Sequence, residues 1–331
     1  MNFSDILDLI DEKVTPSILL LCHSNADPDA LGSAYALQGL FKKLRPAVKV
    51  VIGTEQGINQ LSKNILNFVP IKFDSNPNID QADFIILIDT NTIQQLGTLA
   101  DKLKSSNTPI IVVDHHIPHP KTRKIARLSI TNESSPSTCE IVYSFYKELK
   151  IKPGLNESNA LFLGIASDTR HFTLGTPSTF KTIFELGEIG VNPKEALSYL
   201  SLPMSFSERV ARIKACKRVQ MHIFNRWIIA FSFVSSYQAS AARSIIDLGA
   251  HMVVVAGKKG EQMEISLRCT KEFNKKTGIH LGKDIAQPLG DYFQGMGGGH
   301  ASAAGLSGIG EFEKAFKQCL SLITQFIPNS T

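Results

Sequence analysis

The stretches ILLLCHSNADPD (18–29), FIILIDT (84–90) and IIVVDHH (110–116) decide how this chain folds. Each begins as an unbroken run of Ile, Leu, Val or Phe and stops abruptly in acids or histidines. Continuous apolar runs of this length are typical of strands that are buried on both faces of a parallel sheet. We therefore expect buried strands whose carboxyl ends carry acidic and histidine side chains.

The rest of the first half fits the same plan. Strands are expected at 17–22, 47–53, 84–89, 109–114 and, more weakly, 124–130. Helical stretches lie between them, notably 29–44 and 92–105, and the amphipathic residues 1–13 form a first helix. This alternation predicts an α/β fold with a mostly parallel sheet in the N-terminal domain. Ligands of such sheets bind beyond the carboxyl ends of the strands, where the acids and histidines follow.

The second half has a different texture. Residues 135–200 are mainly helical in pattern, and later segments predict strands at 226–234, 251–259 and 264–269, a helix around 236–248, and a glycine-rich loop at 294–305 that opens a helix. This pattern indicates a smaller C-terminal α/β domain. Several glycines and prolines between 187 and 207 indicate a linker between the two domains. We therefore expect domains at 1–190 and 208–331 joined by a linker at 191–207.

Composition excludes several classes of protein. The chain has 331 residues, of which 43% are hydrophobic, and a net charge of +5. Its five cysteines are widely spaced without a CxxC pair, which speaks against a disulfide framework or a zinc ribbon and favours the reducing cytoplasm. The first residues do not resemble a signal peptide, and the apolar runs are too short to span a membrane. A cytoplasmic protein without a membrane partner is expected.

The acids and histidines at the strand ends form one candidate site. Buried carboxylates are costly unless cations lie nearby, and oxygen and nitrogen donors without cysteine suit Mn²⁺, Mg²⁺ or Zn²⁺. Taken singly, each Asp would be a helix cap or turn residue, and the His pair would be solvated or part of the core. Their joint occurrence instead favours two metal ions that share a carboxylate. The set comprises His23, Asp27, Asp29, Asp89, Asp114, His115, His116 and, from IASDTRHF (165–172), Asp168.

In their order these motifs resemble the DHH superfamily of phosphoesterases, and the resemblance covers almost the whole chain. HSNADPDALGS (23–33) is similar to its first motif, Asp89 to its second, Asp114-His115-His116 to the triplet that names it, and Asp168 to its fourth. GGGHASAAG (297–305) resembles the signature of the DHHA1 domain that often accompanies it.

The resemblance implies a role for each residue. One metal would be held by His23, Asp27 and Asp89, and the other by Asp29, Asp89, His115 and Asp168. Mn²⁺ is the usual ion, with Mg²⁺ as the alternative. Asp114 would orient the histidines and His116 would face the scissile phosphate, so Asp89, Asp114 and His116 are the catalytic candidates. In the second domain, substrate would contact Arg268, Gly298, Gly299 and His300.

Three local departures or additions are visible. Arg170 and His171 stand where many relatives have a glycine, so the loop after Asp168 is altered or offers extra phosphate contacts. The loop SPST (135–138), followed by Glu140, is expected to reach the site. Pro288 falls within an apparent helix, which therefore starts late or kinks there.

The resemblance implies hydrolysis of a phosphoester by a hydroxide that two metals activate. In its size and two-domain organisation the chain resembles the branch of nanoRNases and pAp phosphatases. The expected substrates are therefore short oligonucleotides, dinucleotides such as pApA, or adenosine 3′,5′-bisphosphate (pAp). A RecJ-like single-strand exonuclease is the alternative, followed by a non-catalytic nucleotide or nucleic-acid binder. Residues 297–300 argue against a family II pyrophosphatase, and family habit suggests a homodimer.

Overall fold

A computed structural model of the chain describes residues 2–117, 119–260 and 262–327. The chain divides into two compact units, one ending at Leu202 and the other beginning at Pro203. The division falls inside the segment 191–207. That segment is not irregular throughout, because α9 (Pro193–Ser198) lies in it and α10 (Phe206–Lys217) starts in it.

The first unit is built on a five-stranded sheet in which every strand pair is parallel. Its strand order is β2-β1-β3-β4-β5. The α/β class with a parallel N-terminal sheet is thus confirmed, and the central strands are buried along their whole length, as their apolar runs predict. The strands are β1 (Ser17–Cys22), β2 (Lys49–Thr54), β3 (Phe84–Ile88), β4 (Ile110–Asp114) and β5 (Ala126–Thr131).

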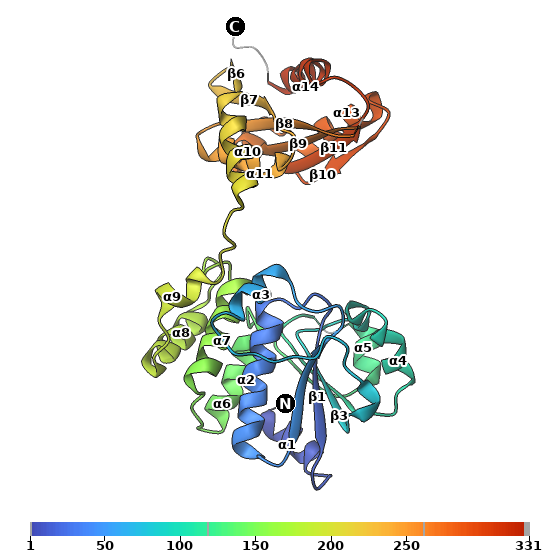
Figure 1. The fold of residues 1–331 in the computed structure, drawn as a ribbon, viewed down its shortest axis with the longest axis vertical. Coiled ribbons are helices and arrows are strands. Elements are labelled where there is room, and N and C mark those ends of the chain that lie inside the picture. The colour runs from blue at the N-terminus through green and yellow to red at the C-terminus, as the bar shows by residue number, and fades with distance from the viewer. Residues whose placement is uncertain (1, 118, 261, 328–331) are drawn as a thin grey trace. The chain divides into compact units, whose positions relative to one another are not determined.

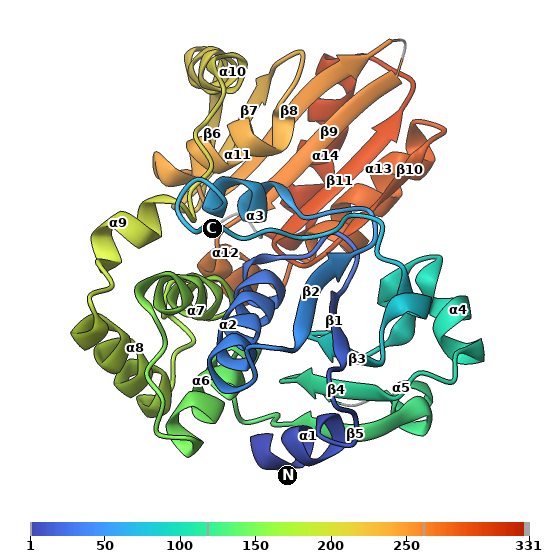
Figure 2. The same ribbon diagram turned by 60° about the horizontal axis from the view of Figure 1, so that its bottom comes forward.

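Helices cover both faces of this sheet (Figure 2). One face packs against α1 (Phe3–Ile10), α2 (Pro28–Leu44), α6 (Thr138–Glu148) and α7 (Leu155–Asp168). The other packs against the short turns η1 (Ile79–Gln81) and η2 (Ile93–Leu96) and against α4 (Leu99–Ser105). Shorter or outer helices complete the unit: α3 (Gln60–Ile65), α5 (Pro120–Ile125) and α8 (Pro177–Ile189).

Two predicted elements of this unit differ from the structure. The helix expected at 92–105 is split into η2 and α4 because Gly97 between them has a φ of +56°. The strand expected from 124 begins only at Ala126, since α5 takes the two preceding residues. Both differences arise at short elements, where a periodic pattern carries little information.

Helices α2 and α7 pack closely through glycine. A Cβ on Gly32 would collide with the backbone of Ala160, and one on Gly164 would collide with Cys139 Sγ and lie 3.0 Å from Asp29 Cα. Glycine in a helix interior costs up to about 1 kcal/mol relative to alanine, so its presence here reflects the close approach. The contact brings the end of α7 beside the start of α2.

The second unit contains a six-stranded mixed sheet of order β10-β11-β9-β8-β7-β6. Only β7 and β8 run parallel. Helices α10 and α11 (Gln238–Asp247) cover one face, and α12 (Lys271–Thr277), the π-helical turn η3 (Leu281–Ala286), α13 (Gln287–Tyr292) and α14 (Phe312–Phe326) cover the other (Figure 1). The strands are β6 (Gln220–Phe224), β7 (Trp227–Phe233), β8 (Met252–Lys259), β9 (Gln262–Cys269), β10 (Met296–Gly299) and β11 (Ala303–Gly308).

The glycine-rich segment is a hairpin rather than a loop that opens a helix, which corrects the prediction. Strands β10 and β11 pair antiparallel, and the next helix begins only at Phe312. A Cβ on Gly297 would overlap the carbonyl of Ala286, and Gly299 has a φ of +138°. Gly297 therefore allows β10 to pack against η3, and Gly299 allows a backbone conformation that favours glycine. Pro288 lies in the first turn of α13, which follows η3 without a break, so the helical segment does not start late but changes from π to α geometry at this proline.

Among the described helices, none has both the length and the apolar character needed to cross a bilayer.

Candidate metal centre

The turn between β1 and α2 presents His23 and Asp27. Asp27 is the N-cap of α2, where its Oδ1 accepts hydrogen bonds of 3.0 Å from the backbone N–H groups of Asp29 and Ala30. His23 Nε2 lies 3.9 Å from the same oxygen. Asp27 thus has the ordinary role of a helix cap, and the capping hydrogen bonds hold its carboxylate beside His23.

Asp29 is fully buried in the first turn of α2. Its Oδ2 accepts from the backbone N–H of Thr138 at 2.7 Å, and its Oδ1 from that of Cys139 at 2.9 Å. These amides begin α6, so the carboxylate faces the positive end of that helix. Burial and the charges of nearby acids raise the pKa of Asp29 nevertheless. The amides alone do not compensate the negative charge of this region.

Asp89 lies at the centre of the cluster and is 4% exposed. It follows β3 with a φ of +51°, a left-handed conformation that non-glycine residues adopt at a cost and that often marks functional sites. Its Oδ2 lies 4.0 Å from His23 Nε2, and its Oδ1 lies 3.6 Å from His115 Nε2. Oδ1 also accepts a 2.9 Å hydrogen bond from Thr138 Oγ1. The two carboxylate oxygens thus face two different histidines.

Asp114 ends β4 and orients the residue that follows His115. Its buried Oδ1 accepts from the backbone N–H of His116 at 2.9 Å and from His116 Nδ1 at 2.8 Å. The hydrogen bonds to Asp114 and Asp89 raise the pKa of His116 to about 10. His116 is the most accessible histidine of the cluster, with 48% of its side chain exposed.

The three histidines of the cluster share one arrangement. Nδ1 of His23 donates to the Ser24 carbonyl at 2.9 Å, Nδ1 of His115 to the Ser135 carbonyl at 3.2 Å, and Nδ1 of His116 to Asp114. The Nε2 atoms of His23 and His115 are left to face the acids. This is the arrangement in which metal-ligating histidines are usually held.

His115 gives the most direct test of whether a metal fits. Its Nε2 is buried, has no hydrogen-bond partner, and lies 3.4 Å from Asp168 Oδ2. A buried polar atom without a partner is costly, and an ion between these groups would satisfy it. The donors are oxygen and nitrogen only, as hard divalent ions prefer. The residues therefore fit a divalent ion.

Asp168 is the last residue of α7. A carboxylate there meets the negative end of the helix, which is unfavourable unless a cation is near. Burial, together with the charges of Asp27 and Asp89, raises the pKa of Asp168. After Thr169, the residues Arg170, His171 and Phe172 have φ values of +50°, +53° and +66°. In this left-handed run, Arg170 and His171 are exposed.

Three sets of donor atoms result, each with all its atoms within 4.8 Å of one another. The sets are His23, Asp27 and Asp89; Asp29, His115 and Asp168; and Asp89, Asp114, His115 and His116. All eight residues that the sequence singled out in the first unit thus come together. Within the loop SPST that was expected to reach the site, the structure identifies Thr138, whose hydroxyl and amide hold Asp89 and Asp29. It adds Gly164, whose missing side chain lets α7 approach. A polar residue at the start of a helix was the available signal for Thr138.

The other predicted site residues belong to the second unit. Arg268, on β9, pairs with Ala303 of β11, and its buried Nε has no hydrogen-bond partner. His300 is exposed in the hairpin turn, where its backbone N–H donates to the Ala303 carbonyl at 2.8 Å. A Cβ on Gly298 would meet open space. Arg268 and the hairpin turn are neighbours on this sheet, and their contact with substrate remains a prediction.

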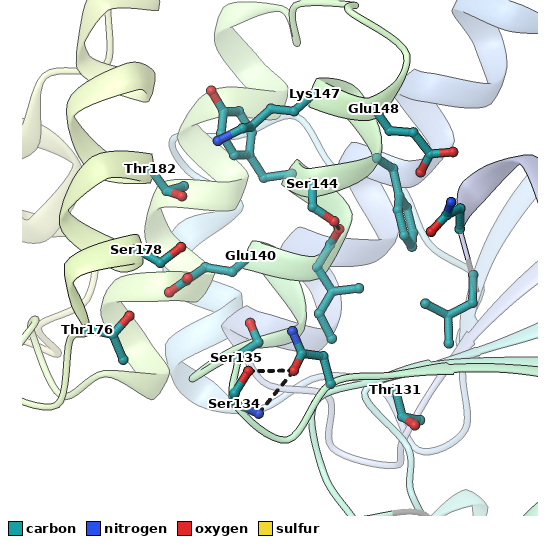
Figure 3. Close-up of a pocket in the computed structure, with 16 residues that line it drawn as sticks. Thr131, Ser134, Ser135, Glu140, Ser144, Lys147, Glu148, Thr176, Ser178 and Thr182 are labelled. Atoms are coloured by element: carbon teal, nitrogen blue, oxygen red, sulfur yellow. Dashed lines mark hydrogen bonds between the residues drawn. The ribbon is translucent and has the colours of Figure 1, made fainter.

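A polar pocket of about 430 Å³ is lined in part by residues of α6 and α8 (Figure 3). Hydroxyl groups dominate its lining, and the Glu140 carboxylate projects from α6 toward Ser178 of α8. Burial raises the pKa of Glu140, which accepts a 2.7 Å hydrogen bond from Thr179. Ser135 lines this pocket and its carbonyl holds His115. The loop SPST thus reaches the cluster, as expected.

Comparison with known proteins places this site in a family. The family described as "DHH family, N-terminal domain" matches residues 17–165. An uncharacterized protein of Methanocaldococcus jannaschii is 36% identical over 324 residues, which cover 96% of this chain and 95% of that protein. A crystal structure of an exopolyphosphatase-related protein from Bacteroides fragilis has the same fold, with a TM-score of 0.63, 19% identity, and coverage of 98% of this chain and 96% of that chain.

Two further relatives have functional names. A probable manganese-dependent inorganic pyrophosphatase of Lactococcus lactis is 30% identical over 213 residues, or 60% of this chain and 64% of that protein. A probable bifunctional oligoribonuclease and PAP phosphatase NrnA of Streptococcus mutans is 24% identical over 203 residues, or 61% of each chain. With the four motifs gathered at one sheet edge and similarity along nearly the whole chain, the protein belongs to the DHH superfamily of phosphoesterases.

Proposed function

We propose that this protein hydrolyses phosphoester bonds in short oligonucleotides, in dinucleotides such as pApA, or in pAp, with divalent metal ions. The observation that carries the proposal is the position of Asp89, whose oxygens face His23 on one side and His115 on the other. A carboxylate in this position suits two ions that share it, and paired ions are typical of phosphoester hydrolysis.

The ligands follow from the donor sets. His23, Asp27 and Asp89 would hold one ion, and Asp29, Asp89, His115 and Asp168 the other. Bound ions would supply charge compensation for the phosphate and a water activated at neutral pH. We propose Mn²⁺ as the preferred ion, which the name of the Lactococcus lactis relative supports.

The chain's own residues would complete the chemistry. Asp114 fixes the ring of His116 through Nδ1, so the half-exposed imidazole can donate a hydrogen bond from Nε2 to a phosphate oxygen. The Asp114 carboxylate raises the pKa of His116, which favours the protonated ring that suits an anion. Arg170 and His171 are exposed two and three residues after Asp168 and would add positive charge on the substrate side. Together these groups favour a phosphate with more than one negative oxygen.

The substrate class rests on the name of the Streptococcus mutans relative, an oligoribonuclease and PAP phosphatase. Pyrophosphate is the second candidate, because the Lactococcus lactis relative is more similar over a comparable length. Short oligonucleotides, dinucleotides and pAp are preferred over pyrophosphate because the second unit carries GGGH at 297–300. This segment resembles the DHHA1 signature, which the second domain of family II pyrophosphatases lacks. The third candidate substrate is a longer single strand of DNA or RNA, as in a RecJ-like exonuclease.

A substrate panel with Mn²⁺ tests the proposal. It contains pAp, pApA, RNA of two to five nucleotides, a longer single-stranded DNA, and pyrophosphate. Turnover should be fastest with one of the first three substrates and lost in Asp89→Asn, with the exposed acid Asp80→Asn as the control that keeps activity. Fastest turnover of pyrophosphate would contradict the substrate class, and stoichiometric Mn²⁺ binding without any hydrolysis would show a binding protein.

A further inference from the structure

One end of the second unit's sheet carries a pocket of aromatic and cationic side chains, here called the aromatic pocket. It encloses about 570 Å³, a size typical of small-molecule sites. One face of α10 forms a wall, the residues that follow β7 form the floor, and Lys258 and Phe312 close it. Its main lining residues are Phe206, Lys214, Arg218, Phe233, Lys258 and Phe312.

The aromatic pocket is separate from the residues predicted to contact substrate in this unit. Lys258 pairs with Met263 at one end of the β8–β9 ladder, whereas Arg268 pairs with Val253 toward the other end. Five residues of strand separate Val253 from Lys258, which corresponds to about 17 Å. The aromatic pocket and the glycine hairpin turn therefore lie at opposite ends of the sheet.

Two phenylalanine rings in the aromatic pocket are exposed. Within the described chain Phe206 is 81% exposed and Phe233 is 40% exposed. Phe233 is held in place by Phe312, with ring centroids 6.0 Å apart and planes at 28°. Base–aromatic stacking is the usual way in which proteins bind nucleobases without reading sequence. Because Arg218 and Phe312 already flank the Phe233 ring, the open stacking face for a planar ligand is that of Phe206.

Three cations surround these rings. The Arg218 guanidinium lies 4.7 Å from the centre of the Phe233 ring and donates from Nη1 to the Phe233 carbonyl at 3.2 Å. Lys214 lies one helical turn before Arg218, and Lys258 reaches the pocket from the end of β8. In the described part of the chain none of the three forms an ion pair, and the lining contains no described carboxylate.

The neighbouring acids do not neutralise this charge. Glu208 of α10 is engaged by Arg212 at 3.4 Å and by the Ser240 hydroxyl. Glu311 and Glu313 flank Phe312 in sequence and are exposed outside the lining. Aromatic rings with unpaired cations favour a planar anion over an apolar partner surface.

We propose that the aromatic pocket binds a nucleoside phosphate, whose base stacks on Phe206 and whose phosphate contacts Lys214, Arg218 and Lys258. The ligand is either a free mononucleotide or a distant nucleotide of a longer strand. Its nucleotide nature agrees with the proposed function, but binding at this pocket requires no hydrolysis and is measured without it.

The test measures binding by the full chain in EDTA, which removes turnover, with 5′-AMP and with a fluorescein-labelled RNA of ten nucleotides. The variants are Phe206→Ala and Lys214→Gln/Arg218→Gln. The control is Lys49→Gln/Lys317→Gln, which removes two exposed lysines outside the pocket. Loss of one stacked base should weaken binding roughly 5- to 150-fold. Loss of two phosphate contacts should reduce the salt dependence of log K for RNA by about 1.4.

Weaker binding of both probes by the pocket variants supports a site open to free nucleotides, and weaker binding of RNA alone supports a site for a distant nucleotide. Pocket variants that bind both probes as the control does would overturn the proposal. If Phe206→Ala fails to fold, Phe206→Trp gives a second readout. Its fluorescence should be quenched by a probe beyond the background of the native Trp227, and no quenching by either probe would again contradict the proposal.

Discussion

Replacing Thr138 with valine is expected to weaken divalent metal binding about 10- to 100-fold while leaving the fold intact. The Thr138 hydroxyl donates a 2.9 Å hydrogen bond to Asp89 Oδ1, in a buried setting. Its backbone N–H donates separately to Asp29 at 2.7 Å, and that bond survives the change. A hydrogen bond to a charged group contributes about 1.5–3 kcal/mol, and 1.4 kcal/mol corresponds to tenfold in affinity. Valine has nearly the same shape, so the start of α6 should persist.

Isothermal titration with Mn²⁺ measures this effect, with thermal unfolding as a check on the fold. Thr138→Ser keeps a hydroxyl and should recover most of the affinity. Thr182→Val removes another buried threonine hydroxyl, on α8, and should bind metal as the unchanged protein does. Affinity of Thr138→Val within about twofold of the unchanged protein, or tighter binding, would refute the reasoning that this hydroxyl positions Asp89.

The remaining predictions concern packing, backbone strain and pH. Gly164→Ala should destabilise the first unit by about 1–3 kcal/mol, since its methyl group would collide with Cys139, and thermal unfolding would show it. Arg170→Gly should stabilise the protein by about 1 kcal/mol, because it removes a left-handed residue, while it lowers turnover in the substrate panel. Lys13, followed by Ser17, lowers the pKa of Asp83 to about 2, so this carboxylate stabilises the fold above its unfolded pKa of about 3.9 and loses that effect as pH falls through 2. Asp83→Asn should therefore lower the melting temperature at pH 6, and most of this effect should be lost near pH 2.

The first unit was largely predictable because its sheet has a strong signal. Buried parallel strands such as β3 and β4 are continuous apolar runs, and their ends mark one edge of the sheet. The candidate residues followed directly, since parallel strands deliver their carboxyl-end side chains to the same place. Asp168 was found from sequence because its motif resembles the family's, although it stands at the end of a helix rather than a strand.

The second unit was less predictable because its small residues give no hydrophobic pattern from which strands can be recognised. Strands β10 and β11 consist mostly of Gly and Ala, which show no alternation, so the hairpin was mistaken for a loop before a helix. The partners of the cluster were hidden for another reason. That Thr138 meets both Asp89 and Asp29 depends on where α6 starts relative to β3 and α2, which is a tertiary relation without a local pattern.

The central claim is that two ions share Asp89. An anomalous difference map from crystals soaked in Mn²⁺ measures this most directly. We expect two peaks, one among His23, Asp27 and Asp89 and one among Asp29, Asp89, His115 and Asp168, with the peak on the first side lost in His23→Ala. A single peak that does not contact Asp89, or none at Mn²⁺ concentrations that support turnover, would contradict the account.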